Sequence, residues 1–283
     1  MTAVKTNAKH LVLDLLLAAD NGTFTASGAL SVREAIAACQ LFGIRENSVR
    51  VALARLSAEG FIMAASRGSY CLGPNALELA GEVATWRTAE QRVRPWSGEF
   101  IAVYTGALGR ADRPALRKRE RALDMLGFRE LERGLFVRPD NIETNISNVR
   151  QRLYSLGLEK EASVFIASEF DPQRSTLIHS LWNGTALNAS YLQTHQQLEQ
   201  WLRHADQLEP DVAARESFLL GGSAIRQVVF DPLLPEPFVD VNARQQFVTT
   251  VKQFDQVGHA IWQRFYGSQH IEPQTARSSL SIH

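Results

Sequence analysis

The 283-residue chain contains only two cysteines, Cys39 and Cys71, and its thirty basic side chains cancel thirty acidic ones. Both cysteines lie within apolar patterns, which argues against a disulfide framework or a cysteine-based zinc site. No apolar run reaches the roughly 20 residues of a membrane span, and the first ten residues lack the apolar core of a signal peptide. We therefore expect a soluble protein in a reducing, cytoplasmic setting.

A net charge of zero means that no global field attracts a nucleic acid, so DNA binding would need a local basic patch. Residues 1–94 carry ten basic and eight acidic side chains, whereas residues 171–283 carry eight basic and eleven acidic ones. The weak excess of positive charge therefore lies in the amino-terminal half.

The first ninety residues predict three helices followed by a short hairpin. Leu11–Ala19 is an apolar run, and SVRE at residues 31–34 has the spacing of a capping box at a helix start. A third helix follows Arg45 and ends at Gly60. The segments FIMAA and SYCLG flank a tight turn and read as two strands. This order predicts a winged helix-turn-helix domain over residues 1–94.

The third helix places Val49, Ala52, Leu53 and Leu56 on one apolar face. The side chains left facing outward, which are able to meet base edges and phosphates, are Asn47, Ser48, Arg50, Val51 and Arg55. Arg67 at the hairpin tip is expected to reach the adjoining backbone or minor groove. The alternative is a purely structural three-helix core, with Arg50 and Arg55 paired to Glu46 and Glu59.

The middle segment, residues 95–170, predicts the order βαββαβ of a ferredoxin-like domain. FIAVYTG, REL, GLFVR and ASVFIASEF read as strands, and PALRKRERALDMLGF and ETNISNVRQRLYSLG read as helices. The densest basic run of the chain falls on the first of these helices and comprises Arg117, Lys118, Arg119 and Arg121. It indicates either a solvated helix face or a contact to phosphate groups of DNA or of a ligand.

Residues 171–283 predict a helical carboxy-terminal domain with a frayed polar tail from Glu272. Candidate helices are Tyr191–Gln207, Val212–Phe230 and Val241–Phe265. Between the last two, DPLLPEPF at residues 231–238 contains three prolines, which break the helix and stiffen the connection.

Several motifs follow one another in a fixed order along the chain: VRVALARLSAEGFI with SRGSYCLG, then WSGEF at residues 96–100, GLFVRPDN at residues 134–141, and DPLLPEPF. Together they resemble the PaaX family of transcriptional regulators. The resemblance spans residues 30–266. It implies an α+β repressor with an amino-terminal winged helix, a central domain similar to a CRISPR-associated nuclease fold, and a helical carboxy-terminal domain.

The best-known family members repress phenylacetate catabolism and leave DNA when they bind phenylacetyl-coenzyme A. Arg50 and Arg55 stand at the family's VRxALxRL positions, so a DNA-contacting role extends to those two. The family motifs do not identify an effector pocket. For the effector we consider the basic run from Arg117 to Arg121 for coenzyme phosphates, and three tryptophans for an aromatic acyl group: Trp182, Trp201 and Trp262. Most such aromatics are core residues in helical proteins.

Enzyme motifs are missing from the sequence. GGSAI at residues 221–225 lacks the second glycine of a nucleophile elbow, and no phosphate-binding glycine loop follows a strand. FIAVYTG contains no aspartate for a nuclease metal, although Glu99 directly precedes it. We therefore expect a homodimeric, ligand-gated repressor of a catabolic gene set for an aromatic acid, with no cofactor and no metal; the alternative is a nucleic-acid-processing enzyme that uses the ferredoxin-like domain.

Overall fold

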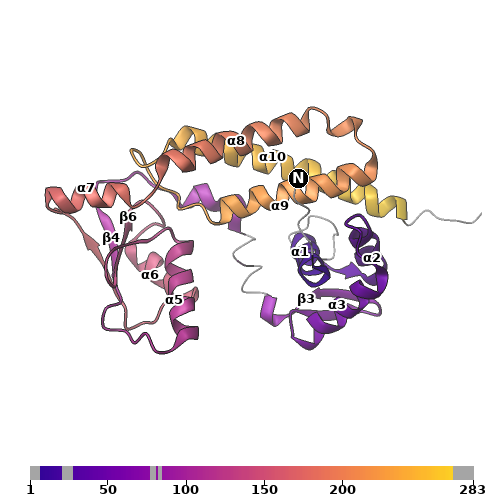
Figure 1. The fold of residues 1–283 in the computed structure, drawn as a ribbon, viewed down its shortest axis with the longest axis horizontal. Coiled ribbons are helices and arrows are strands. Elements are labelled where there is room, and N and C mark those ends of the chain that lie inside the picture. The colour runs from indigo at the N-terminus through magenta and orange to yellow at the C-terminus, as the bar shows by residue number, and fades with distance from the viewer. Residues whose placement is uncertain (1–6, 21–27, 77–80, 82–84, 270–283) are drawn as a thin grey trace, which may run out of the picture. The chain divides into compact units, whose positions relative to one another are not determined.

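The computed structural model describes residues 7–20, 28–76, 81 and 85–269 (Figure 1). The chain divides into two compact units. Unit 1 comprises Met1–Ala84, Leu202–Gly222 and Gln253–His283, and unit 2 comprises Thr85–Trp201 and Ser223–Lys252. The carboxy-terminal helices contribute residues to both units. The division into domains 1–94, 95–170 and 171–283 stays a prediction.

Unit 1 contains the three helices and the hairpin predicted from the sequence. The helices are α1 (Ala8–Asp20), α2 (Val32–Gln40) and α3 (Glu46–Ala58). Strands β2 (Ile62–Ser66) and β3 (Ser69–Leu72) form the hairpin, and β1 (Leu30–Ser31) adds an antiparallel edge on the other side of β3. The sequence did not predict β1, because two residues are too few to show an alternating pattern.

The capping box at the start of α2 is present in full. The Ser31 Oγ accepts a hydrogen bond from the Glu34 backbone N–H at 3.1 Å, and the Glu34 carboxylate accepts one from the Ser31 N–H at 2.8 Å. Farther along the same helix, Cys39 is fully buried, and burial raises the pKa of its thiol to about 12. Cys39 therefore acts as an apolar core residue, as its sequence context indicated.

Unit 2 is built on a four-stranded antiparallel sheet. Its elements follow the predicted βαββαβ order: β4 (Phe100–Tyr104), α5 (Arg113–Met125), β5 (Arg129–Glu132), β6 (Leu135–Pro139), α6 (Ile146–Ser155) and β7 (Ser163–Ala167). The spatial order of the strands is β5-β6-β4-β7, so the first strand pairs with both the third and the fourth.

The two faces of this sheet are covered differently. Helices α5 and α6 lie on one face and bury Leu123 and Leu153 there (Figure 1). On the other face, Phe100 of β4 contacts Phe238, and the His179 ring of α7 (Pro172–Ser180) stacks on Phe238 with 4.9 Å between ring centroids. The proline-rich segment at residues 231–238 is therefore part of the packing of unit 2.

The carboxy-terminal part is helical, as predicted. Its helices are α8 (Gly184–Leu202), α9 (Pro210–Val229) and α10 (Val241–Gln269), with a short turn η2 (Ala205–Gln207), while η1 (Thr85–Arg92) opens unit 2. The sequence did not predict α7, although Asp171 caps it and Pro172 occupies its first turn, which together are a helix-start signal. Among the described residues, no helix is long and apolar enough to cross a membrane.

Candidate functional site

Helix α3 buries one face and exposes another, as its sequence pattern requires. Val49, Ala52, Leu53 and Leu56 are all buried. The side chains that the sequence assigned to DNA, all of them exposed, are Asn47, Ser48, Arg50, Val51 and Arg55. Exposure of the apolar Val51, at 43%, leaves a methyl-bearing side chain in water, where it is available to a thymine methyl group.

The charges on α3 only partly follow the structural alternative. Arg50 pairs with Glu46 one turn earlier, at 2.7 Å between Nη2 and Oε1, and both side chains remain more than half exposed. Glu59 pairs with Lys9 of α1 and not with Arg55. Among the residues that the structure describes, Arg55 has no ion pair. An exposed ion pair such as that of Arg50 with Glu46 contributes little stability. The guanidinium groups of Arg50 and Arg55 therefore both remain accessible to phosphates or base edges.

The hairpin presents a third cation at its tip. Arg67 is exposed between β2 and β3, and Gly68 adopts a positive φ of 77°, which suits glycine. The Gly68 carbonyl accepts a hydrogen bond from the Val32 N–H at 3.0 Å, so the turn is fastened to the start of α2. Unit 1 thereby presents α3 and a fixed hairpin tip as two separate points for contact.

In unit 2, Arg138 organises a buried polar network. Its guanidinium donates to the Leu126 carbonyl, to the Asn141 Oδ1 at 2.9 Å and to the Pro232 carbonyl at 3.3 Å. The Asn141 amide in turn donates to the Leu233 carbonyl at 2.7 Å. Two motifs that carry the family resemblance, GLFVRPDN and DPLLPEPF, are thus joined through side chains and carbonyls.

Burial lowers the pKa of Arg138 to about 9, and the nearby Asp140 and Glu143 carboxylates oppose that change. The guanidinium therefore stays charged at neutral pH. Asp231 is also buried, and burial raises the pKa of its carboxyl group. Its Oδ1 accepts the Leu233 N–H at 2.7 Å, which fixes the turn of the proline-rich segment.

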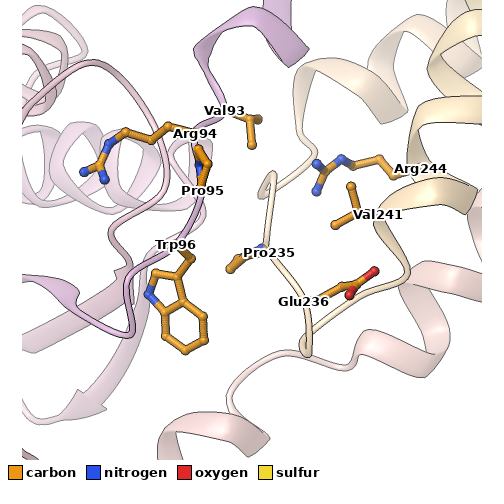
Figure 2. A pocket seen from close by; sticks show the side chains of 8 residues that line it. All are labelled: Val93, Arg94, Pro95, Trp96, Pro235, Glu236, Val241 and Arg244. Atoms are coloured by element: carbon orange, nitrogen blue, oxygen red, sulfur yellow. The ribbon is translucent and has the colours of Figure 1, made fainter.

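A pocket of about 420 Å³ lies beside this network, within unit 2 (Figure 2). Its lining is mainly apolar, with three charged side chains, and comprises Val93, Arg94, Pro95, Trp96, Pro235, Glu236, Val241 and Arg244. The volume falls within the range of small-molecule sites, about 300–1,000 Å³. The sequence did not single out this pocket, because its walls come from two stretches far apart in the chain, residues 93–96 and residues 235–244.

The two arginines of the pocket face different ways. Arg244 is fully buried, donates to the Leu234 carbonyl and binds Glu90 at 2.9 Å between Nε and Oε1. Figure 2 shows its guanidinium directed towards the segment of Pro235, while that of Arg94 points away from the pocket. Arg94 is paired with Asp140. Both cations are neutralised, so the pocket offers apolar walls and hydrogen-bonding groups and not an excess of positive charge.

The predicted effector residues lie in several places. Trp182 is buried and donates to the Gly127 carbonyl at 3.0 Å, and Trp262 is buried against Phe218 and Tyr266. Trp182 and Trp201 belong to unit 2, whereas Trp262 belongs to unit 1.

The side chains of the basic run on α5 also differ in burial. Arg119 is buried, with a bidentate contact to Glu159 of 2.6 Å from Nη2 to Oε1 and 3.0 Å from Nε to Oε2, whereas Arg117, Lys118 and Arg121 are exposed. Within the described ranges, no group of three or more histidine, cysteine, aspartate and glutamate side chains is placed to hold a metal ion.

Fold and site together define an α+β protein that exposes a polar, arginine-bearing helix on a three-helix unit and carries a second unit with an antiparallel sheet. Two family models match the chain: PaaX-like protein over residues 20–75 and PaaX-like protein C-terminal domain over residues 182–264. The chain belongs to the PaaX-like protein family.

A curated relative is the transcriptional repressor PaaX of Escherichia coli (strain K12), 30% identical over 207 residues. The match covers 69% of this chain and 63% of the relative, so the chain matches less than two thirds of that protein. The relative is a transcriptional repressor, which agrees with the prediction that this chain is not an enzyme. A solved structure, uncharacterized protein Rv0674 from Mycobacterium tuberculosis, shares the fold, with a TM-score of 0.52 and 22% identity over 89% of this chain and 98% of that chain.

Proposed function

We propose that the chain is a transcriptional repressor that binds operator DNA through a winged helix-turn-helix in unit 1 and responds to a small-molecule effector. The observation that carries the proposal is the exposed face of α3, where Arg50 and Arg55 flank Val51 on a helix held by its opposite, buried face. A helix of this kind enters the major groove, with the wing at Arg67 reaching the adjacent backbone. The homology to a repressor supports the same assignment.

We further propose that the repressor acts as a homodimer in the cytoplasm. A two-fold dimer presents two recognition helices to an inverted repeat, and the larger unit sets their spacing. The regulated genes are expected to form a catabolic cluster for an aromatic acid of the phenylacetate type. These finer points follow from the family resemblance.

For the effector, we propose the pocket beside Trp96 as a further candidate besides the predicted tryptophans and basic run. Pro95, Pro235 and the indole of Trp96 provide flat apolar walls that suit an aromatic acyl group, such as that of an aromatic acyl-coenzyme A. Helix α10 supplies Val241 and Arg244 to this pocket and continues to residues that belong to unit 1. The beginning of α10, where the ligand would bind, is therefore joined through one continuous helix to residues of the unit that carries α3.

The first experiment is selection of binding sites by the full chain from a random duplex library, followed by titration of the enriched sequence. An enriched inverted repeat is expected, and binding is expected to depend on Arg50 and Arg55. Recovery of no preferred sequence would contradict the repressor assignment. A duplex incubated with the protein and magnesium serves as the control for the alternative, since cleavage would identify a nucleic-acid-processing enzyme.

The second experiment adds acyl-coenzyme A thioesters and free aromatic acids to the protein–DNA complex. An effector must bind the DNA-free state more tightly, because equal affinity for both states shifts nothing. The variant Val241→Trp fills the pocket without altering its charged groups, so it is expected to bind DNA normally and to resist release. Unchanged release in this variant would place the effector elsewhere, and Trp201→Ala then tests the predicted site.

A further inference from the structure

Helix α5 of unit 2 carries a row of arginines that form no ion pair with the other residues that the structure describes. Arg113, Arg117 and Arg121 repeat every four residues, so they lie along one side of the helix, and all three are exposed. Within the described residues none of them forms an ion pair. By contrast, ion pairs are formed by other arginines, among them Arg50, Arg92, Arg94, Arg119, Arg129, Arg152, Arg174 and Arg244.

This row is unfavourable for the helix that bears it. Like charges four residues apart repel each other. Arg113 is the first helical residue, where the positive end of the helix dipole also disfavours a cation. Arg110 and Lys118 add exposed positive charge nearby. Among the acidic neighbours, Asp112 caps the helix, Asp124 is paired with Arg129, and Glu120 has no ion-pair partner among the described residues. The two carboxylates that form no ion pair among the described residues, Asp112 and Glu120, are thus outnumbered by five exposed cations: Arg110, Arg113, Arg117, Lys118 and Arg121.

We propose that this row, Arg113, Arg117 and Arg121, is a second DNA contact that binds the phosphodiester backbone without reading sequence. The inference rests on the proposed function in unit 1 and adds a binding surface in unit 2. Three side chains spaced by four residues span roughly 12 Å at a rise of about 1.5 Å per residue, a length over which one strand presents several phosphates. Arginine forms bidentate hydrogen bonds with phosphate, which suits this role.

The shape of the surface favours a duplex over the phosphates of a coenzyme. Small-molecule sites are concave and bury most of the ligand, whereas these arginines stand on the exposed side of a helix. Arg119, the one member of the predicted basic run that is buried, is occupied by Glu159 and by the Gly109 carbonyl. Only the outward-facing cations of α5 are available, and an extended polyanion reaches them without a cavity.

The test uses the full chain and a random-sequence 40-base-pair duplex, because backbone contacts do not depend on sequence. The variant R113Q/R117Q/R121Q is compared with R203Q/R215Q/R226Q, which removes the same charge from exposed arginines elsewhere. The first variant is expected to bind roughly 10- to 100-fold more weakly at 0.1 M salt and to reduce the slope of log affinity against log salt by about 2–3. The control variant is expected to follow the wild type more closely. Glu120→Gln should act in the opposite direction and tighten binding.

Equal affinities and slopes for the two triple variants would overturn the proposal. If the wild type selects an operator but the α5 variant binds duplex normally, only this inference fails; if the wild type binds no duplex at low salt, the proposed function fails with it. Coenzyme A is titrated into the DNA-free proteins as a further arm. Loss of coenzyme A binding in R113Q/R117Q/R121Q with intact duplex binding would assign the row to the effector and overturn the DNA contact.

Discussion

Arg138 and Arg244 in unit 2 are 1% and 0% exposed, whereas Arg50, Arg55 and Arg67 in unit 1 lie on the surface. The buried pair donates to backbone carbonyls and to neighbouring side chains, so Arg138 fastens the proline-rich segment to β6 and Arg244 fastens it to α10. The surface group leaves its guanidinium atoms largely in water. The same residue type therefore stabilises one region and remains available to a partner in the other.

The same difference explains why the sequence motifs of the family lie in the buried network of unit 2 and do not identify the binding sites. The motifs GLFVRPDN and DPLLPEPF are distinctive because Arg138 and Asn141 need particular carbonyls from residues 232 and 233. These two motifs therefore reflect packing within unit 2. The exposed positions of α3 have no such internal requirement, so their role depends on what binds to them.

The largest effect is expected at Arg138. Replacement by methionine keeps much of the side-chain volume but leaves the acceptors on Leu126, Pro232 and Asn141 unpaired in a buried region. We expect a loss of about 3–5 kcal/mol in the free energy of unfolding, measured by urea denaturation. Arg129→Met removes a partly exposed arginine from the same sheet, whose ion pair with Asp124 lies at the surface, and is expected to cost below about 1 kcal/mol. Similar losses in both variants would erase the distinction between buried and surface arginines.

Next come the two arginines of α3, the helix proposed to contact DNA. Arg50→Ala and Arg55→Ala are each expected to weaken operator binding by about 1–3 kcal/mol, measured by fluorescence anisotropy, while circular dichroism and the urea midpoint stay near those of the wild type. Each loss follows from a cationic contact that only DNA completes. A variant that unfolds instead would show that its arginine belongs with Arg138.

Periodicity in the sequence predicted the three amino-terminal helices and the β2–β3 hairpin of unit 1 and the βαββαβ order of unit 2 well, since each element buries one regular face. It predicted α8 seven residues late, at Tyr191 instead of Gly184, because the first two turns of α8 contain few apolar side chains. It did not predict that Phe218 of α9 packs against Phe42 in unit 1, at 5.6 Å between ring centroids. Such contacts join residues far apart in the chain, which no local pattern reveals.

The exposed face of α3 was predictable from helical spacing alone, but the pairing of its charges was not. Arg50 and Glu46 are one turn apart and were expected as a pair, whereas Glu59 binds Lys9 from another helix. The pocket beside Trp96 was not predictable, since Val93, Pro235 and Val241 come together only in the folded unit. The ion-pair partners and the pocket lining that the local sequence does not determine are therefore set by tertiary contacts.

An intermediate effect is expected for the pair of Arg119 and Glu159. The hydrogen bond from Arg119 lowers the pKa of the Glu159 carboxyl below its usual range. A depressed pKa means that the pair stabilises the protein above the unfolded-state pKa, about 4.3, and that this stability is lost as the pH falls through the folded-state pKa. Glu159→Gln should cost about 1–2 kcal/mol at pH 7. The difference from the wild type should shrink below roughly pH 4, and a pH-independent difference would contradict the ion pair.

The smallest effect, and the finest test of the comparison, is expected at Glu46. This carboxylate pairs with Arg50 on the surface and lies in the first turn of α3, where its negative charge also interacts favourably with the helix dipole. Glu46→Gln should therefore lower the free energy of unfolding by less than about 1 kcal/mol. If Arg50 serves DNA, the same substitution releases its guanidinium and removes a negative charge near the phosphates, so duplex affinity should rise severalfold at low salt and less at high salt. If Arg50 serves only the helix, stability falls and affinity stays constant. Anisotropy titrations at two salt concentrations, with Glu59→Gln at the opposite end of α3 as the control, separate these outcomes.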